Sequence, residues 1–160
     1  PENESEMAKV ALSTSIPIAT GERLASKYEF NRILRSGAAA ILQMNLGRVG
    51  GILEAKKIAG MAEAYYTPLV LHNSSGPCTR AASLQIAAAI PNFLIMERGD
   101  SEYDDLLVEA LPPVRDGHRP LLAEPGLGIE IDEESLRAQV GEPCEYPNYF
   151  DQDDGSVIDW

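Results

Sequence analysis

The sequence predicts an α/β fold in which short parallel strands alternate with helices, as in one half of an eight-stranded barrel. Three observations lead to this fold class. Brief, wholly apolar runs alternate with stretches of helical periodicity along the first hundred residues. A polar side chain follows each apolar run, and these side chains lie 23, 27 and 25 residues apart. That spacing suits a (β/α)8 barrel with short loops, which uses about 30 residues for each strand and helix.

The first elements follow from apolar periodicity and turn residues. The chain opens on a helical stretch, PENESEMAKV, with no strand ahead of it. A first strand is expected at residues 16–20 (IPIAT), which run into the turn GER. A helix is expected over residues 26–35, and a second strand over residues 39–43 (AAILQ). The segment GRVGG, at residues 47–51, is then expected to open the next helix.

The same pattern continues to about residue 96. The helix after GRVGG has apolar residues at positions i, i+3, i+4 and i+7, namely Ile58, Met61, Ala62 and Tyr65. This spacing predicts one apolar face. The remaining elements are a strand at residues 68–71 (PLVL), an Ala-rich helix at residues 79–89 and a strand at residues 92–96 (NFLIM).

The strands are apolar at every position, which is typical of a parallel sheet covered on both faces. An open doubly wound sheet gives the same local pattern and is the structural alternative to a barrel. Four strands make only half a barrel, which leaves open edges and an unfilled interior. Together with the abrupt start of the chain, this favours the second half of a barrel whose first half lies elsewhere. A self-standing four-stranded sheet is the other interpretation.

The charge and cysteine content exclude some classes of partner. The formal net charge is −12, whereas a nucleic-acid surface needs clustered Lys and Arg. No apolar run approaches the roughly 20 residues that cross a bilayer, and no signal peptide is visible. Cys78 and Cys144 lie far apart without metal-type partners nearby. We therefore expect two free thiols in a cytoplasmic protein, with neither a nucleic acid nor a membrane as partner.

Four polar side chains follow the predicted strands: Glu22, Asn45, His72 and Glu97. In a parallel barrel, the loops at the carboxyl ends of the strands build the active site, so these side chains should converge there. A carboxylate such as Glu22 is a suitable Mg²⁺ ligand, although an acid after a strand is often only a solvated loop charge. Two acids, an amide and an imidazole in one place suit metal-assisted proton chemistry without specifying it.

The other candidates also have structural interpretations. His72 could be a hydrogen-bonded structural histidine, and His118, within RDGHRP, is interpreted as a surface-loop residue. GRVGG could cradle a phosphate on its backbone N–H groups. It matches neither the Walker loop nor the GxGxxG fingerprint, so a tight turn is the favoured interpretation.

Six segments of the chain carry a family resemblance. They are SIPIATGERL, ILQMNLGRVGGILEAKKIAGMAEA, LHNSSGPCTRAASLQIAAAIPNF, MERGD, EPGLGIEID and the ending GSVIDW. In this order and at this spacing, they resemble the mandelate racemase and muconate-lactonizing branch of the enolase superfamily. Within that branch, the chain is most similar to the galactonate dehydratase-like acid-sugar dehydratases.

The resemblance implies a modified (β/α)7β barrel of the TIM type, capped by an α+β domain. The chain would supply strands five to eight, with residues 1–100 forming the second half of the barrel. Residues 101–160 would complete the barrel and return toward the capping domain. The N-terminal half of the barrel and the capping domain, with two further metal-ligand acids, would be required from outside the chain. The family also implies a homo-oligomer.

The resemblance further implies roles for single residues. Glu22 corresponds to the third Mg²⁺ ligand, and His72 to a general base or acid that also contacts substrate. Glu97 corresponds to an acid that, when protonated, donates a hydrogen bond to the substrate carboxylate. The implied reaction removes the proton α to the carboxylate of a sugar acid, with Mg²⁺ as cofactor, and then eliminates water to give a 2-keto-3-deoxy sugar acid. Racemisation or epimerisation and lactone cycloisomerisation are the enzymatic alternatives.

One candidate catalytic position departs from the family pattern. Many members carry Asp after the sixth strand, where this chain has Asn45 within QMN. The Asp normally orients the strand-seven histidine and stabilises its imidazolium form, whereas an amide can orient the ring but carries no charge. His72 could then act as a neutral hydrogen-bonding group, with a lysine outside the chain as the base. Two further hypotheses are a non-catalytic relative that binds sugar acids or metal, and an open-sheet phosphate-binding module.

Overall fold

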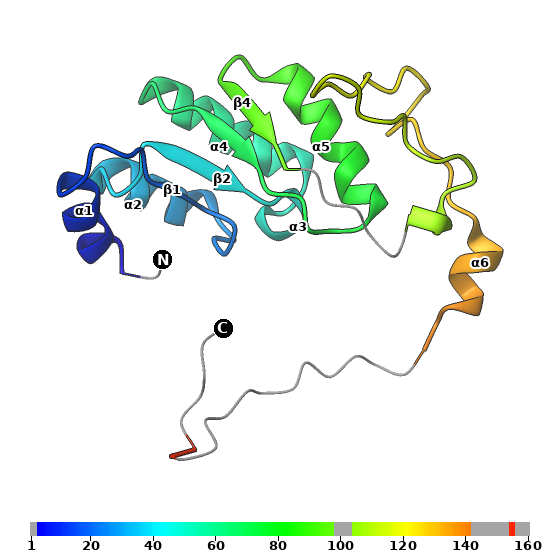
Figure 1. Cartoon of the computed structure of the whole chain (residues 1–160), viewed down its shortest axis with the longest axis horizontal. Coiled ribbons are helices and arrows are strands. Elements are labelled where there is room, and N and C mark those ends of the chain that lie inside the picture. The colour runs from blue at the N-terminus through cyan, green and yellow to red at the C-terminus, as the bar shows by residue number, and fades with distance from the viewer. Residues whose placement is uncertain (1–2, 98–103, 142–153, 156–160) are drawn as a thin grey trace.

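The computed structural model describes residues 3–97, 104–141 and 154–155. Within them lies a parallel four-stranded sheet whose strand order, β1-β2-β3-β4, is also the order along the chain (Figure 1). The elements are α1 (Glu4–Leu12), β1 (Ala19–Thr20), α2 (Lys27–Ser36), β2 (Ile41–Met44), α3 (Leu46–Val49), α4 (Ile52–Ala64), β3 (Leu69–Leu71), α5 (Pro77–Ala89), β4 (Phe93–Met96), the 3-10 helix η1 (Asp104–Leu106) and α6 (Glu133–Ala138). The order never reverses, unlike that of a doubly wound sheet. The predicted α/β fold of parallel strands is confirmed.

Helix α2 illustrates how the sequence sets the limits of these elements. Ser26 is its N-cap and forms a capping box with Glu29, in which each side chain accepts a hydrogen bond from the backbone of the other residue. Gly37 ends the helix in the left-handed conformation, with a φ of 66°. The side chains of Phe30 and Ile33 are buried, so this face of the helix packs into the core. The helix therefore lies where the periodicity predicted it.

One apolar cluster joins the helices α2, α4 and α5 to one face of the sheet. Leu42 and Met44 of β2 are fully buried in this cluster, whereas Ile41 and Gln43 are only partly buried. Successive side chains of a strand point to opposite faces. Gln43 therefore lies on the face away from the helices, which is the face that lines the interior of a barrel.

Two helix predictions need correction. GRVGG was expected to open the helix that carries Ile58, but its first three residues belong to the separate short helix α3. Gly50 and Gly51, with φ values of 94° and 87°, separate α3 from α4. Tyr65 was expected on the apolar face of α4, but it caps the end of that helix and is 45% exposed. The helix stops before Tyr65, since the chain turns at Tyr66 with a φ of 55°.

The strands differ in burial more than their composition predicted. All three residues of β3 are buried, as expected for a central parallel strand. Phe93, Leu94 and Ile95 of β4 are exposed, and so is Ala19 of β1. The expectation that every strand is buried on both faces is therefore wrong for both edge strands of this sheet. In the described part of the chain β4 pairs with β3 alone, which leaves its other edge open.

The segment after β4 has little regular structure where it is described. Leu107 and Ile131 form an isolated antiparallel bridge, and α6 lies at the opposite end of the molecule from α1 (Figure 1). The proposed division at residue 100 falls outside the described residues, as do Cys144 and most of the ending GSVIDW. Cys78 is an exposed free thiol. None of the described helices is long and apolar enough to pass through a bilayer.

An ion pair between α2 and α4 predicts a pH-dependent stability. Lys27 Nζ lies 2.8 Å from Glu54 Oε2. The hydrogen bond from Lys27, followed by that from Lys57, lowers the pKa of Glu54 from its ordinary 4.5. A lowered carboxyl pKa stabilises the folded chain above the unfolded pKa, and this contribution disappears as the pH falls through the folded pKa. We expect Lys27→Met to lower the melting temperature at neutral pH. The difference in melting temperature between this variant and wild type should disappear as the solution is acidified below about pH 4.

Thermal unfolding followed by circular dichroism at a series of pH values checks this expectation. Lys9→Met is the matched control, because Lys9 pairs with Glu6 of its own helix α1 and the side chains of both residues are largely exposed. If the difference in melting temperature between Lys27→Met and wild type stays constant into the acid range, the ionised Glu54 carboxylate is not the source of the stabilisation.

Candidate active site

The polar side chains singled out in the sequence lie together at the carboxyl edge of the sheet. Glu22 follows β1, Asn45 follows β2, His72 follows β3 and Glu97 follows β4. Parallel strands present their carboxyl ends at one edge, so the short connections bring these side chains to one place. Residues that are up to 75 positions apart in the chain thereby form one polar cluster.

His72 lies at the centre of this cluster. Its Nδ1 is 2.9 Å from Asn45 Nδ2, and its Nε2 is 3.2 Å from Glu22 Oε2. The same Nε2 is 3.8 Å from Glu97 Oε2. The His72 side chain is 14% exposed, whereas Glu22 and Glu97 are 45% and 39% exposed. One ring nitrogen therefore faces a buried amide, and the other faces two accessible carboxylates.

Asn45 is held between helix α3 and His72. It is the N-cap of α3, and its Oδ1 accepts hydrogen bonds from the backbone N–H groups of Gly47 and Arg48. Its Nδ2 contacts His72 and donates to Ser75 Oγ at 3.2 Å. Both ends of this buried amide therefore have partners.

Two residues that sequence reasoning missed fix the position of Glu97. Gln43 Nε2 donates to Glu97 Oε1, and the backbone N–H of Asn73 donates to Glu97 Oε2 at 3.1 Å. Asn73 Nδ2 also donates to the Glu97 carbonyl oxygen at 3.4 Å. The period of two in β2 could have revealed Gln43, since it is the one polar residue of that strand and lies on the interior face. No signal in the sequence marked Asn73.

Gly21 sets the turn that presents Glu22, and it tolerates no side chain. Its φ is 143°, and an added Cβ would lie 2.7 Å from the Gln43 carbonyl oxygen and 2.8 Å from Phe30 Cε1. We expect Gly21→Ala to lower the free energy of unfolding by about 1–3 kcal/mol, because both the backbone conformation and the crowding are unfavourable. Urea unfolding of the chain measures this loss.

Gly37→Ala is the matched control for the crowding at Gly21. Gly37 also has a positive φ, of 66°, but no atom lies within 4 Å of an added Cβ. The cost there should be limited to the left-handed conformation, at about 1 kcal/mol. A Gly21→Ala variant as stable as Gly37→Ala would contradict the close packing around Gly21.

The described side chains supply one suitable ligand for Mg²⁺, but they do not supply a complete set of ligands. Glu22 offers an accessible carboxylate oxygen, the ligand type that Mg²⁺ prefers. Among the described residues, no group of three or more His, Cys, Asp or Glu side chains is arranged to hold a metal ion. Glu22 could therefore hold Mg²⁺ only together with ligands that these residues do not supply.

The segment GRVGG does not support a phosphate site. The N–H groups of Gly47 and Arg48 donate to Asn45 Oδ1, and that of Val49 donates to the Asn45 carbonyl oxygen. Those of Gly50 and Gly51 donate to the Leu46 carbonyl oxygen. Because a phosphate cradle needs free N–H groups, the tight-turn interpretation is the better one.

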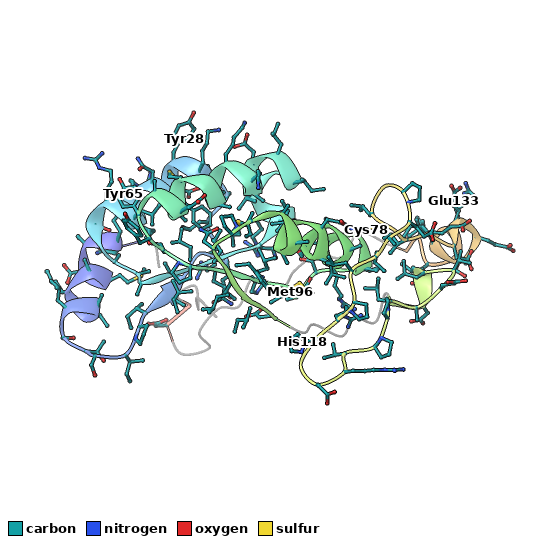
Figure 2. The ribbon with its side chains drawn as sticks, turned by 90° about the horizontal axis from the view of Figure 1, so that it is seen from above. Tyr28, Tyr65, Cys78, Met96, His118 and Glu133 are labelled. Atoms are coloured by element: carbon teal, nitrogen blue, oxygen red, sulfur yellow. The ribbon has the colours of Figure 1, made fainter. Side chains whose placement is uncertain are left out.

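A cavity of about 660 Å³ adjoins the cluster on the side of α5 and β4. Asn73 and Glu97 line it beside apolar side chains such as Leu84 and Ile95. The loop that carries His118 also lines this cavity, as does Met96 of β4, and Figure 2 labels both residues. His118 is exposed on that loop, as the sequence predicted, and its Nδ1 lies 2.8 Å from the Asp116 carbonyl oxygen.

Comparison with known proteins gives the family. A protein-family model described as enolase C-terminal domain-like matches residues 1–135 of this chain. The D-galactonate dehydratase of Variovorax paradoxus is 38% identical over 99% of this chain and 44% of its own length. The D-xylonate dehydratase of Haloferax volcanii is 39% identical over 89% of this chain and 35% of its own length. The chain thus spans less than half the length of these relatives.

Solved structures agree with this assignment. The mandelate racemase/muconate lactonizing enzyme from Sulfitobacter sp. superposes with a TM-score of 0.81 and 45% identity, over 91% of this chain and 40% of that one. The mandelate racemase/muconate lactonizing enzyme-like protein from Roseovarius sp. TM1035 gives a TM-score of 0.79 and 48% identity, over 86% and 35%. The chain therefore belongs to the enolase C-terminal domain-like family, in the mandelate racemase and muconate-lactonizing branch of the enolase superfamily.

Proposed function

We propose that this chain is the half of a Mg²⁺-dependent acid-sugar dehydratase that contributes barrel strands five to eight. It works with an N-terminal half that supplies the other strands, the remaining metal ligands and the capping domain. The observation that carries the proposal is the convergence of Glu22, His72 and Glu97 at the carboxyl edge of a parallel sheet. The relatives named D-galactonate and D-xylonate dehydratase support a sugar acid as substrate.

The chemistry explains why these groups are needed together. A proton α to a carboxylate is too weakly acidic for a side chain to remove unless the developing negative charge is stabilised. Mg²⁺, when bound, would supply Lewis-acid stabilisation of that charge. Glu22 would hold the ion through a carboxylate oxygen. Glu97, positioned by Gln43 and Asn73, would donate to the substrate carboxylate in its protonated form.

His72 occupies the place where the substrate would meet both acids. Its Nε2 lies within 3.2 Å and 3.8 Å of the two carboxylates and points to the accessible side of the cluster. An imidazole at this position can hydrogen-bond the reacting part of the sugar acid. Loss of the β-hydroxyl as water would then give a 2-keto-3-deoxy acid.

Mass spectrometry with a library of aldonic and aldaric acids tests this function. The assay uses the complete protein in which this chain is joined to its N-terminal half, with Mg²⁺ present. We expect at least one acid to lose a single water molecule, and we expect chelation of Mg²⁺ to stop the reaction. If no acid in the library loses water, the dehydratase proposal is wrong.

The same samples separate the other candidate functions. Exchange of the α-proton with solvent deuterium, without loss of water, would indicate a racemase, an epimerase or a lactone cycloisomerase. Asn45, which supplies no charge to stabilise an imidazolium, favours a second candidate, a relative that binds sugar acids without turning them over. Binding measured by calorimetry without either reaction would support that candidate.

A further inference from the structure

We infer that Asn45 selects, for a neutral His72 ring, the tautomer with the proton on Nε2, so that this nitrogen presents a hydrogen-bond donor and not a base. The inference begins with the orientation of the Asn45 amide. Oδ1 accepts from the Gly47 N–H at 2.8 Å and from the Arg48 N–H at 3.3 Å. Asn45 is only 3% exposed, so a flipped amide would place its NH₂ against two backbone donors away from water. Nδ2 must therefore face His72.

The amide orientation then determines the histidine tautomer. Asn45 Nδ2 donates one hydrogen to Ser75 Oγ and directs the other at His72 Nδ1, 2.9 Å away. An amide NH₂ only donates, so Nδ1 must be the acceptor. In a neutral imidazole the other nitrogen then carries the hydrogen. Glu22 Oε2 lies 3.2 Å from His72 Nε2, and a carboxylate oxygen beside this nitrogen suits a proton on it.

This tautomer is the reverse of the one that a carboxylate at position 45 would select. A carboxylate accepts from Nδ1–H and leaves the Nε2 lone pair free to take a proton. With Asn45 the Nε2 position is a donor, so the α-proton must pass to a base outside this chain, such as the amine of the lysine that the family resemblance suggests. A neutral imidazole can still polarise a substrate oxygen through such a hydrogen bond. This consequence for catalysis rests on the proposed function, whereas the tautomer rests on the contacts of the amide alone. Asn45 is thus a positioning residue.

Nuclear magnetic resonance of the complete protein, in which this chain is joined to its N-terminal half and all histidines carry ¹⁵N, tests the inference. Long-range ¹H–¹⁵N spectra distinguish the two tautomers, and a pH of about 8 keeps an ordinary imidazole neutral. We expect His72 to carry its proton on Nε2. His118 is the internal reference, since its Nδ1 lies 2.8 Å from the Asp116 carbonyl oxygen and must donate there. His118→Gln and His72→Gln identify the signals of these two residues by removing them.

Two variants test the cause of the tautomer. Asn45→Asp should exchange the ¹⁵N shifts of the two His72 nitrogens by moving the proton to Nδ1. Ser75→Ala removes the other acceptor of Nδ2 and should leave the His72 tautomer unchanged. A wild-type spectrum with the proton on Nδ1, or an unchanged tautomer in Asn45→Asp, would overturn the inference. The wild-type spectrum alone is decisive if Asn45→Asp does not fold. Because no substrate is present, failure of the dehydration assay leaves this result unaffected.

Discussion

Replacing Glu22 with glutamine is expected to lower kcat/KM of the assembled enzyme by at least about a hundredfold. Glu22 offers the one strand-end carboxylate assigned to the metal, and its Oε2 also lies 3.2 Å from His72 Nε2. Glutamine keeps the size of the side chain but removes the negative charge that a hard divalent cation requires. Steady-state kinetics at increasing Mg²⁺ concentration should show both the loss of rate and a weaker dependence on the metal.

Glu63→Gln is the matched control for this experiment. Glu63 is an exposed residue of α4, away from the strand ends, and the same loss of charge there should leave the kinetics unchanged. Wild-type kinetics in Glu22→Gln would remove Glu22 from the metal site. An equal loss in both variants would show that net charge, and not the position of Glu22, matters.

Phe30→Ala should be the most destabilising single change in the core, lowering the free energy of unfolding by about 3–5 kcal/mol. The Phe30 side chain is fully buried in the cluster between α2 and the sheet. Its ring also lies against Gly21, the residue before Glu22. Alanine would leave a cavity at this position, because the neighbouring backbone can close it only in part. Urea unfolding of the chain measures the loss.

Tyr28→Ala provides the comparison on the same helix. Tyr28 is 68% exposed and contacts Lys27 through its ring, so its removal should cost less than about 1 kcal/mol. Equal destabilisation by the two variants would mean that Phe30 is not the core contact that the structure shows.

The sequence predicted that these four side chains lie together, because the relevant signal is local. A short apolar run marks a buried parallel strand, and the polar residue after it marks the carboxyl end of that strand. His72, directly after the fully buried β3, is the clearest case. Once the strands were recognised as parallel, the meeting of four such residues followed from the fold class alone.

The details that the sequence missed depend on neighbours distant in the chain. β4 has the composition of a buried strand, but the exposure of its side chains depends on which segments cover the two faces of the sheet there. The hydrogen bond between Gln43 and Glu97 joins residues 54 positions apart. The direction of the Asn45 amide depends on the N–H groups at the start of α3. The sequence did not predict α3 as a separate helix. Local patterns do not encode such pairings.

Crystallography of the assembled protein with Mg²⁺ and an unreactive sugar acid tests the proposed site most directly. We expect a Glu22 oxygen at about 2.0–2.1 Å from the metal ion. The substrate carboxylate should lie within hydrogen-bond reach of Glu97, and His72 Nε2 should face a substrate oxygen. Mg²⁺ bound without Glu22, or a sugar acid bound away from the carboxyl edge of the sheet, would contradict the assignment of this cluster as the active site.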